Sequence, residues 1–447
     1  MYRKLIAFWT AAIILATACS QDYPQRPAPT PRQASWQDLE YYMFCHFGPN
    51  TFTNMEWGLG NEDPSVFNPT DLDCRQWARI AKAAGMKGII ITAKHHDGFC
   101  LWPSAQSTHT VAQSSWRDGK GDVLKELSEA CKAEGILFGV YVSPWDRNHP
   151  AYGTPEYNKV YAQTLREVHT GYGKIFEQWF DGANGEGPNG KKQTYDWELF
   201  HNVVRELSPD CVMFSDVGPD IRWIGNEKGY VGETNWNTMN TEGFTPGAGA
   251  PPREVLNQGE IDGAVWVPGE VDVSIRPGWF YSPDTDDKVK STEELMGIWF
   301  SSVGRGSNLL LNVPPDRRGK IHPADSAALM NFKAARDKAF ANDLAKEAKV
   351  KTRRKGVQQM TIDLKWGKEI QAGIIELRED LANGQYASSF RAESISADGS
   401  SVLLCEGTTI GHKRLLAIDP ASTSHIRVTV STLGPTSIEA SVYPPAK

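Results

Sequence analysis

The segment Lys87-Gly88-Ile89-Ile90-Ile91-Thr92-Ala93 decides the fold, because consecutive apolar residues predict a strand that is buried on both faces. Helical patterns flank it at residues 71–84 and 123–134, and each of these patterns stops at a glycine. The apolar run at residues 136–142 predicts the next buried strand. Buried strands that alternate with helices are typical of a parallel sheet covered by helices.

The same alternation continues along most of the chain. Further strands are predicted at residues 42–47, 174–180, 211–215, 264–267 and 308–313. Further helices are predicted at residues 155–171, 197–207, 292–303 and 324–340. About 300 residues of this pattern fit an α/β fold, namely a (β/α)8-like TIM barrel. No G-x-G-x-x-G motif follows an early strand, which argues against a dinucleotide-binding fold.

Composition and charge limit the class of protein. Of the 447 residues, 40% are apolar and 23% are charged, which excludes a disordered or collagen-like chain. Short strand-like runs separated by turn residues follow the barrel pattern and predict a C-terminal antiparallel β-sandwich. We expect a signal peptide at residues 1–19, a linker at 20–35, the barrel at 36–345 and the sandwich at 346–447. The net charge of −7 leaves no excess of cations for phosphate groups, so we expect no nucleic-acid partner.

The N-terminal residues have the pattern of an export signal. A basic start at residues 1–4 precedes a largely apolar, uncharged run at residues 5–18 that is too short to span a bilayer comfortably. The string Leu15-Ala16-Thr17-Ala18-Cys19 resembles the lipobox of bacterial lipoproteins, in which the cysteine carries the lipid. We expect an exported lipoprotein, periplasmic or at the cell surface, whose only membrane contact is the lipid on Cys19. A soluble exported protein cleaved near Ala18 is the alternative.

The other six cysteines show no pairing pattern. Their spacings contain no C-x-x-C motif, which argues against structural zinc, and several of them lie within apolar strand or helix patterns. We therefore expect buried free thiols, although an oxidising compartment leaves disulfides open. These cysteines are Cys45, Cys74, Cys100, Cys131, Cys211 and Cys405.

Polar and aromatic residues follow the predicted strands at the end where a barrel carries its functional groups. Histidine and glutamate can hydrogen-bond hydroxyl groups, and tryptophan can cover apolar C–H faces, so this set predicts a pocket for a neutral polyol. The residues are His46, Glu56, Trp57, residues 94–97, 141–146 and 179–181, Asp216, Arg222, Trp223, Asn226, Glu227, Glu270 and Arg276.

A metal centre at His95-His96-Asp97 is the competing interpretation. Imidazole and carboxylate groups suit zinc or iron, but consecutive strand residues point to opposite faces, and no H-x-H or H-x-x-x-H spacing accompanies them. We therefore expect no metal and no cofactor. A carboxylate such as Asp181, which follows a strand, can also be a helix N-cap with no chemical role.

Four strings resemble the α-L-fucosidases of glycoside hydrolase family 29, and the resemblance covers nearly all of residues 36–345. They are Phe44-Cys45-His46-Phe47-Gly48, Glu56-Trp57, Thr92-Ala93-Lys94-His95-His96-Asp97-Gly98-Phe99 and Trp179-Phe180-Asp181-Gly182-Ala183. Two more are similar to the branch that includes plant enzymes and cleaves α-1,3/1,4-linked fucose on branched glycans. They are Arg222-Trp223-Ile224-Gly225-Asn226-Glu227 and residues 270–280.

The resemblance implies a retaining exo-α-L-fucosidase that acts on fucosylated glycans by double displacement, without a cofactor. Asp181 matches the family's nucleophile, and Glu227 is the expected acid/base, with Glu270 or Asp216 as the alternative acid. Val142 stands where family members often have a second aromatic residue, a difference expected to alter the pocket wall. The implied fucose contacts are His46, Glu56, Trp57, His95, His96, Tyr141, Trp179, Arg222 and Trp299.

Retention needs two carboxyl groups about 5 to 5.5 Å apart, one ionised and one protonated. Asp181 and Glu227 follow consecutive predicted strands, which would be neighbours in a barrel. The alternatives are a related α-L-glycosidase such as an L-galactosidase, a transfucosidase, or a non-catalytic glycan-binding lipoprotein. The sandwich either binds carbohydrate or supports the barrel, and its few aromatic residues favour support.

Overall fold

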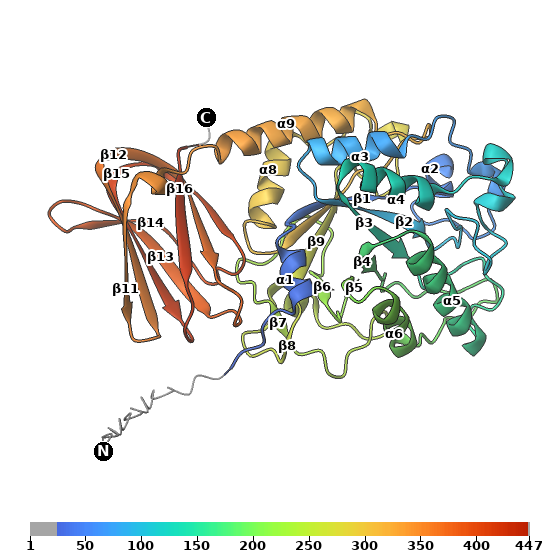
Figure 1. Cartoon of the computed structure of the whole chain (residues 1–447), viewed down its shortest axis with the longest axis horizontal. Coiled ribbons are helices and arrows are strands. Elements are labelled where there is room, and N and C mark those ends of the chain that lie inside the picture. The colour runs from blue at the N-terminus through green and yellow to red at the C-terminus, as the bar shows by residue number, and fades with distance from the viewer. Residues whose placement is uncertain (1–24, 446–447) are drawn as a thin grey trace, which may run out of the picture.

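The computed structural model describes residues 25–445, and its larger part is a closed barrel of eight parallel strands (Figure 1). The strands follow one another around the barrel in the order β1-β10-β9-β6-β5-β4-β3-β2. This confirms the predicted α/β barrel. The strands are β1 Tyr41–Cys45, β2 Gly88–Lys94, β3 Leu137–Val142, β4 Ile175–Trp179, β5 Val212–Ser215, β6 Ile221–Trp223, β9 Gly269–Ser274 and β10 Asn308–Asn312.

Six long helices surround the barrel: α3 Cys74–Ala83, α4 Val123–Glu134, α5 Pro155–Gly171, α6 Trp197–Leu207, α8 Thr292–Ser301 and α9 Pro323–Ala339. The bounds predicted for α4, α5 and α6 agree with the structure, and α4 has a strong signal at each end. The Asp122 side chain accepts the Lys125 N–H at the start of α4, and Gly135 ends the helix at φ 71°. The shorter helical segments are α2 Pro49–Thr53, α7 Arg253–Gln258, η1 Pro64–Val66, η2 Val111–Gln113, η3 Trp116–Gly119, η4 Pro283–Thr285 and η5 Leu344–Glu347.

One predicted barrel strand is wrong. Residues 264–267 contain only β8 Val265–Trp266, which pairs with β7 Thr238–Met239 in a small separate sheet. The barrel instead uses β6 and β9, which the sequence pattern placed in loops. β6 has only three residues, and β9 carries Glu270, Asp272 and Ser274 at alternate positions, so neither gives an apolar run. Only residues 216–220 connect β5 to β6, so this parallel connection contains no helix.

Helix α1, Pro31–Gln37, lies at the amino ends of the strands. Trp36 enters the apolar cluster inside the barrel, and its Nε1–H donates to Glu177 Oε2 at 2.9 Å. Gln33 Nε2 donates to the carbonyls of Asp220 and Trp266. The folded region thus begins before residue 36, where the sequence placed the boundary. The predicted signal peptide and Cys19 lie outside the described residues.

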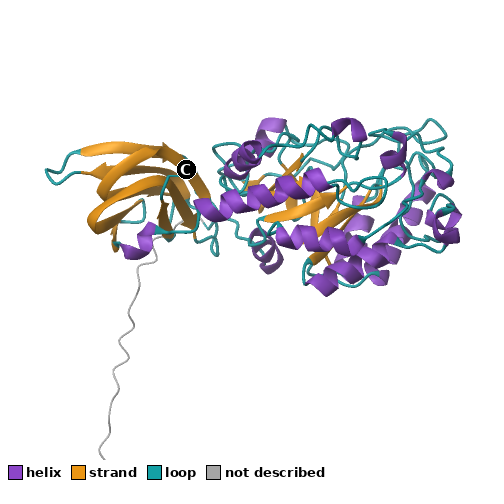
Figure 2. Cartoon of the chain, turned by 90° about the horizontal axis from the view of Figure 1, so that it is seen from above, coloured by secondary structure: helices purple, strands orange, loops and turns teal. Residues whose placement is uncertain are grey.

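The C-terminal domain is an antiparallel six-stranded sheet with its own apolar core (Figure 2). Strands β12 and β15 are long and pair with each other along their length, with register shifts in β12 after Lys365 and Ala372. Trp366 is buried in this core and donates to the Leu344 carbonyl at 2.8 Å, so it offers no surface to a sugar. The strands are β11 Lys349–Lys355, β12 Gln359–Glu379, β13 Ala387–Ile395, β14 Ser401–Gly407, β15 Arg414–Thr432 and β16 Ile438–Tyr443.

The six cysteines of the described region are free thiols, as predicted, and all except the half-buried Cys405 are buried. Burial raises the pKa of the Cys131 thiol to about 12, so it stays protonated at neutral pH. Between residues 25 and 445, no helix has the length and apolar character needed to cross a lipid bilayer.

Candidate active site

A cavity of about 260 Å³ opens at the carboxyl ends of the strands. Asp181 lies just after β4, beyond Phe180, and lines this cavity, and Glu227 lines it from the loop after β6. The structure therefore brings together the two carboxyl groups on which the sequence analysis centred. The other lining residues are Trp179, Gly182, Ala183, Phe214, Asp216, Trp223 and Asp272.

Two hydrogen bonds hold the Asp181 carboxylate. Tyr141 Oη donates to Oδ2 at 2.9 Å, and the Ala183 N–H donates to Oδ1 at 2.7 Å. His96 Nε2 lies 3.5 Å from Oδ2, and 22% of the Asp181 side chain remains exposed. Burial, together with the charge of Asp181, raises the pKa of Tyr141 well above its ordinary value, so the phenol keeps its proton and donates. Since α6 begins only at Trp197 and is capped by Asp196, Asp181 is not a helix N-cap.

His96 presents an unprotonated nitrogen to this carboxylate. The Ser143 hydroxyl donates to the Trp145 carbonyl at 2.8 Å, so its oxygen accepts from His96 Nδ1, also at 2.8 Å. Burial lowers the pKa of His96 despite the opposing charge of Asp181, so the ring is neutral at neutral pH. Nε2 is therefore able to accept a hydrogen bond from a substrate hydroxyl.

His46 is fixed in the same way by a residue that the sequence analysis did not name. Asn312 Nδ2 donates to Ser274 Oγ and to the Trp279 carbonyl, both at 2.8 Å, which orients the amide. Asn312 Oδ1 lies 2.9 Å from His46 Nδ1 and accepts its proton, so His46 Nε2 is an acceptor. Burial lowers the pKa of His46 to about 3, since the bond to Asn312 opposes it only in part.

His95 completes a row of three buried imidazoles. Its ring centroid lies 4.2 Å from that of His96 and 5.8 Å from that of His46. Asn50 Nδ2 approaches His95 Nδ1 at 3.5 Å, which leaves the hydrogen on Nε2. Burial and the two other imidazoles lower the pKa of His95 well below its ordinary value. In the described part of the chain, no three His, Cys, Asp or Glu side chains are grouped closely enough to hold a metal ion.

Glu227 lies in a different environment from Asp181. Its Oε2 accepts the Trp279 Nε1–H at 3.3 Å. Burial raises the pKa of Glu227; the Trp279 hydrogen bond and Arg253 oppose the shift, whereas the charge of Asp181 adds to it. This carboxyl group therefore keeps its proton to a higher pH than an ordinary glutamate does.

The two alternative acids differ in position. Glu270 lies inside the barrel, fully buried, where Trp179 Nε1 donates to its Oε1 at 2.9 Å and Tyr42 donates to Oε2. It lies on β9 and does not follow a strand, contrary to the sequence interpretation. Asp216 lines the cavity with Asp181, and burial raises its pKa to about 6, so it stays an alternative.

Aromatic side chains surround the carboxyl groups. Trp179 stacks on Tyr141 and Phe214, with ring centroids 5.2 and 4.1 Å away. Trp57 is 55% exposed, and its ring meets the His96 ring edge-on at 5.7 Å. Trp223 also lines the cavity, and its Nε1–H donates to Asp272 Oδ1 at 3.0 Å.

Glu56 contacts the loop after β9, where its Oε2 accepts the Trp279 N–H at 2.7 Å. Gly278 allows this approach, because a Cβ there would lie 2.3 Å from Glu56 Oε1. Trp279 thus links Glu56, Glu227 and His46, whose ring centroid lies 5.0 Å from its own. The sequence analysis quoted Trp279 within a family string but did not name it as a site residue.

The structure does not bring Arg222 or Trp299 into the cavity, contrary to the prediction. Arg222 points out of the barrel because its strand neighbours Ile221 and Trp223 point in. Its guanidinium is fully buried and donates to the carbonyls of Leu256, Val267 and Trp236 and to Asn235 Oδ1. Arg222 therefore anchors the 224–268 loop.

Trp299 lies on α8 and packs against Tyr41 and Phe332, with ring centroids 5.9 and 6.2 Å away. It belongs to the layer between barrel and helices, because a helix that covers the barrel turns its apolar face toward the outer side of the strands. Val142 also packs in this layer, so the missing aromatic residue does not change the cavity wall.

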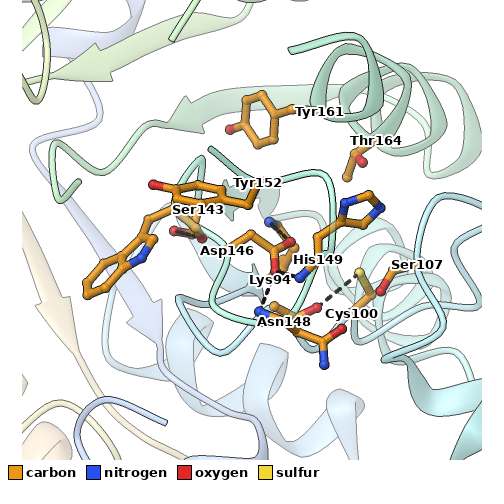
Figure 3. Close-up of polar contacts among 12 residues, drawn as sticks. Lys94, Cys100, Ser107, Ser143, Asp146, Asn148, His149, Tyr152, Tyr161 and Thr164 are labelled. Carbon is orange, nitrogen blue, oxygen red and sulfur yellow. Dashed lines mark hydrogen bonds and ion pairs between the residues drawn. The ribbon is translucent and has the colours of Figure 1, made fainter. Parts of the chain in front are cut away.

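A buried ion pair between Lys94 and Asp146 links the end of β2 to the loop after β3 (Figure 3). Lys94, the last residue of β2, donates to Asp146 Oδ2 at 2.8 Å and to Tyr157 Oη at 3.0 Å. Asp146 Oδ1 accepts the N–H groups of Asn148 and His149. This pair joins the end of β2, which His95 and His96 follow, to the loop that carries Ser143, so it holds the two segments together.

Comparisons with known proteins agree with this geometry. A family model described as Alpha-L-fucosidase matches residues 31–334. The chain is 41% identical over 421 residues to Alpha-L-fucosidase 1 of Arabidopsis thaliana, over 88% of this chain and 82% of the plant protein.

Solved structures are similar over nearly the whole chain. A glycoside hydrolase 29 family member from an unknown rumen bacterium has a TM-score of 0.88 at 43% identity, over 95% of this chain and 78% of that one. A Ruminococcus gnavus GH29 fucosidase in complex with fucose has a TM-score of 0.86 at 30% identity, over 96% of this chain and 98% of that one. The chain therefore belongs to the α-L-fucosidases of glycoside hydrolase family 29.

Proposed function

We propose that this α-L-fucosidase releases terminal fucose with retention of configuration, with Asp181 as nucleophile and Glu227 as acid/base. The observation that carries the proposal is that both carboxyl groups line one cavity in unlike environments. The donor Tyr141 stabilises a negative charge on Asp181, whereas burial favours the protonated form of Glu227.

The reaction has two steps. An Asp181 oxygen attacks C1 of fucose while the bond from C1 to the leaving oxygen breaks, and Glu227 gives its proton to that oxygen. Glu227 then takes a proton from water, and the water oxygen attacks C1 and displaces Asp181. Fucose leaves with its original configuration, and both carboxyl groups return to their starting states.

The groups around the carboxyls suit a neutral deoxy sugar. His46 and His96 each present an unprotonated Nε2 that accepts from a sugar hydroxyl, while His95 Nε2 donates. Trp179 and Trp223 offer apolar surface to the C–H face and to the methyl group of 6-deoxy fucose. Glu56, Trp57 and Tyr141 complete the proposed set of contacts.

The retaining mechanism is tested with an aryl α-L-fucoside and its products. NMR during the first minutes should show α-L-fucose as the first anomer. Asp181→Gly should lower kcat by at least about 10³-fold, and azide should rescue it by forming β-L-fucosyl azide. Asp210→Asn, which changes an exposed carboxylate paired with Lys174, should keep wild-type turnover. An initial β-anomer would disprove retention, and an active Asp181→Gly without azide would disprove the nucleophile.

The preferred linkage is proposed to be α-1,3/1,4 on branched glycans. The Gly225-Asn226-Glu227 string, which carries the acid/base, supports this, since it is the feature that resembles that branch. Lewis-type trisaccharides and 2-linked fucosyllactose should be incubated separately and the released fucose measured. Equal release from both would contradict the proposal.

We also propose that the chain is exported and anchored by a lipid on Cys19, a residue outside the described region. Metabolic labelling with an alkyne fatty acid should mark the wild-type protein in the membrane fraction. Cys19→Ala should lose the label, and a wild-type protein without label would contradict the anchor.

A further inference from the structure

A second cavity, of about 690 Å³, opens on the other side of Glu227. Its lining residues lie in the segments 223–230 and 253–258, at the end of β6 and in the connection from β6 to β9. Trp223 and Glu227 line this cavity as well as the one that holds Asp181. Glu227 thus lies between two neighbouring cavities.

The position of the acid decides what this second space receives. In the proposed mechanism, Glu227 gives its proton to the leaving oxygen, so the leaving saccharide lies on the Glu227 side of the bond. Fucose itself occupies the smaller cavity, because Asp181 must reach its C1. The saccharide attached to fucose therefore extends toward the larger cavity, a conclusion that rests on the proposed function.

Two cations of this cavity make no side-chain hydrogen bond or ion pair in the described part of the chain, although the charge of Arg253 acts on Glu227 and opposes the rise in its pKa. The Lys228 and Arg253 side chains both line it, and neither makes a hydrogen bond or an ion pair within residues 25–445. The carboxylates on the same wall are Glu227, which must be protonated to act as acid, and Glu254. Two cations then face one anion, which leaves an excess of positive charge.

Tyr230 adds a surface for a sugar ring. It lines the same cavity, its side chain is 41% exposed, and its hydroxyl makes no hydrogen bond within the described residues. An exposed aromatic ring beside polar groups is suited to the C–H face of a pyranose.

We propose that this cavity is the leaving-group subsite and that it selects saccharides bearing an anionic substituent, a carboxylate or a sulfate ester, through Lys228 and Arg253. Tyr230 packs on the pyranose ring that carries the substituent. Neutral fucosylated glycans enter the same cavity but leave both cations without a partner.

The test compares kcat/KM for three fucosylated trisaccharides with the same linkage, one neutral, one sulfated and one sialylated on galactose. At low salt the wild type should prefer an anionic substrate by about tenfold, and the preference should shrink as salt rises. A preference for only one anionic substrate identifies the substituent. The ratio of anionic to neutral kcat/KM is the readout, because it cancels effects common to both substrates.

Arg253→Gln and Lys228→Gln should each lower the ratio of anionic to neutral kcat/KM, and Arg253→Glu should invert it. The control is Lys351→Gln, which changes an exposed lysine on β11 and should leave the ratio unchanged. An aryl α-L-fucoside, which has no charged group, reports on the proposed function separately. Two outcomes overturn the subsite inference when the aryl fucoside is still cleaved. In the first, the wild-type ratio of anionic to neutral kcat/KM is one. In the second, the Arg253 and Lys228 variants leave this ratio unchanged. If the aryl fucoside is not cleaved, the proposed function itself fails.

Discussion

Individual hydrogen bonds determine which groups of this site donate and which accept. His46 and His96 are neutral because they are buried, and Nε2 is the acceptor atom of each ring because Nδ1 donates to a partner, Asn312 or Ser143. Both partners look unremarkable in the sequence, since single Asn and Ser residues occur throughout a chain. Their function arises only where neighbouring strands of the barrel meet, β10 with β1 and β3 with β2.

Asn312→Leu should test this role of the amide. His46 Nδ1 would lose its acceptor, and kcat/KM for an aryl fucoside should fall by about 10- to 100-fold, which corresponds to about 1–3 kcal/mol. Asn308→Leu is the matched control, because Asn308 lies on the same strand but donates to the Trp36 carbonyl, away from the cavity. The control should change stability but not kcat/KM. Wild-type kcat/KM in Asn312→Leu would contradict the role.

Trp279→Phe should move the pH dependence of the enzyme. The Trp279 hydrogen bond stabilises ionised Glu227 and lowers its pKa, so its loss raises that pKa. An acid must be protonated to act, and activity is lost as pH rises through its pKa. The alkaline limb of kcat/KM should therefore shift upward by about half to one pH unit, the effect of one hydrogen bond.

The control for this shift is Trp102→Phe, which removes a similar bond from Trp102 Nε1 to Glu167 Oε2, outside the cavity. Its pH profile should match that of the wild type. A downward shift of the alkaline limb in Trp279→Phe would show that Glu227 is not the acid.

At the scale of elements, the barrel holds its loops by contacts between strand ends. The Lys94–Asp146 pair joins the end of β2 to the loop after β3, and both side chains are buried. In contrast, the Lys159–Glu156 pair lies on the exposed face of α5. The N–O distances of the two pairs are similar, 2.8 and 3.1 Å, but the first pair is buried and the second is exposed to water.

Lys94→Met should lower the free energy of unfolding by about 3–5 kcal/mol, because it leaves the Asp146 charge buried without its partner. Lys159→Met should cost less than about 0.5 kcal/mol, since water already screens that pair, whose side chains are 73% and 64% exposed. Urea unfolding followed by fluorescence measures both. Equal losses in the two variants would contradict this account.

At the scale of the whole molecule, charged groups join the two domains. Glu40, between α1 and β1, pairs with Arg378, His412 and Lys413 of the C-terminal domain. Burial opposes ionisation of Glu40, but these partners outweigh it and lower its pKa to about 2. The C-terminal domain therefore contacts the barrel beside the amino end of β1.

Glu40→Gln should lower the free energy of unfolding at pH 7 by about 2 kcal/mol, since burial of Lys413 offsets part of the gain. The pKa of Glu40 is lower in the folded than in the unfolded state. Its contribution is therefore complete above pH 4.5 and is lost as pH falls toward 2. Urea unfolding at several pH values should show this loss in the wild type but not in Glu40→Gln. The exposed Glu406→Gln should behave as the wild type.

The sequence by itself determined the class of fold, the bounds of the helices with strong end signals, and the two carboxyl positions to examine. These features depend on local patterns: apolar runs, caps and short strings. Strands β6 and β9 were not predicted. β6 has only three residues, and β9 has polar residues at alternate positions, so neither strand gives an apolar run.

Only the tertiary structure decided which side chains meet. It placed Arg222 on the outer face of the barrel and Trp299 in the layer between the barrel and the helices. It also brought Trp279 and Asn312 next to His46. The physical reason is that a side chain's direction depends on strand register and on the turn of the helix that carries it. Those are set by packing among segments far apart in the chain, which no local pattern records.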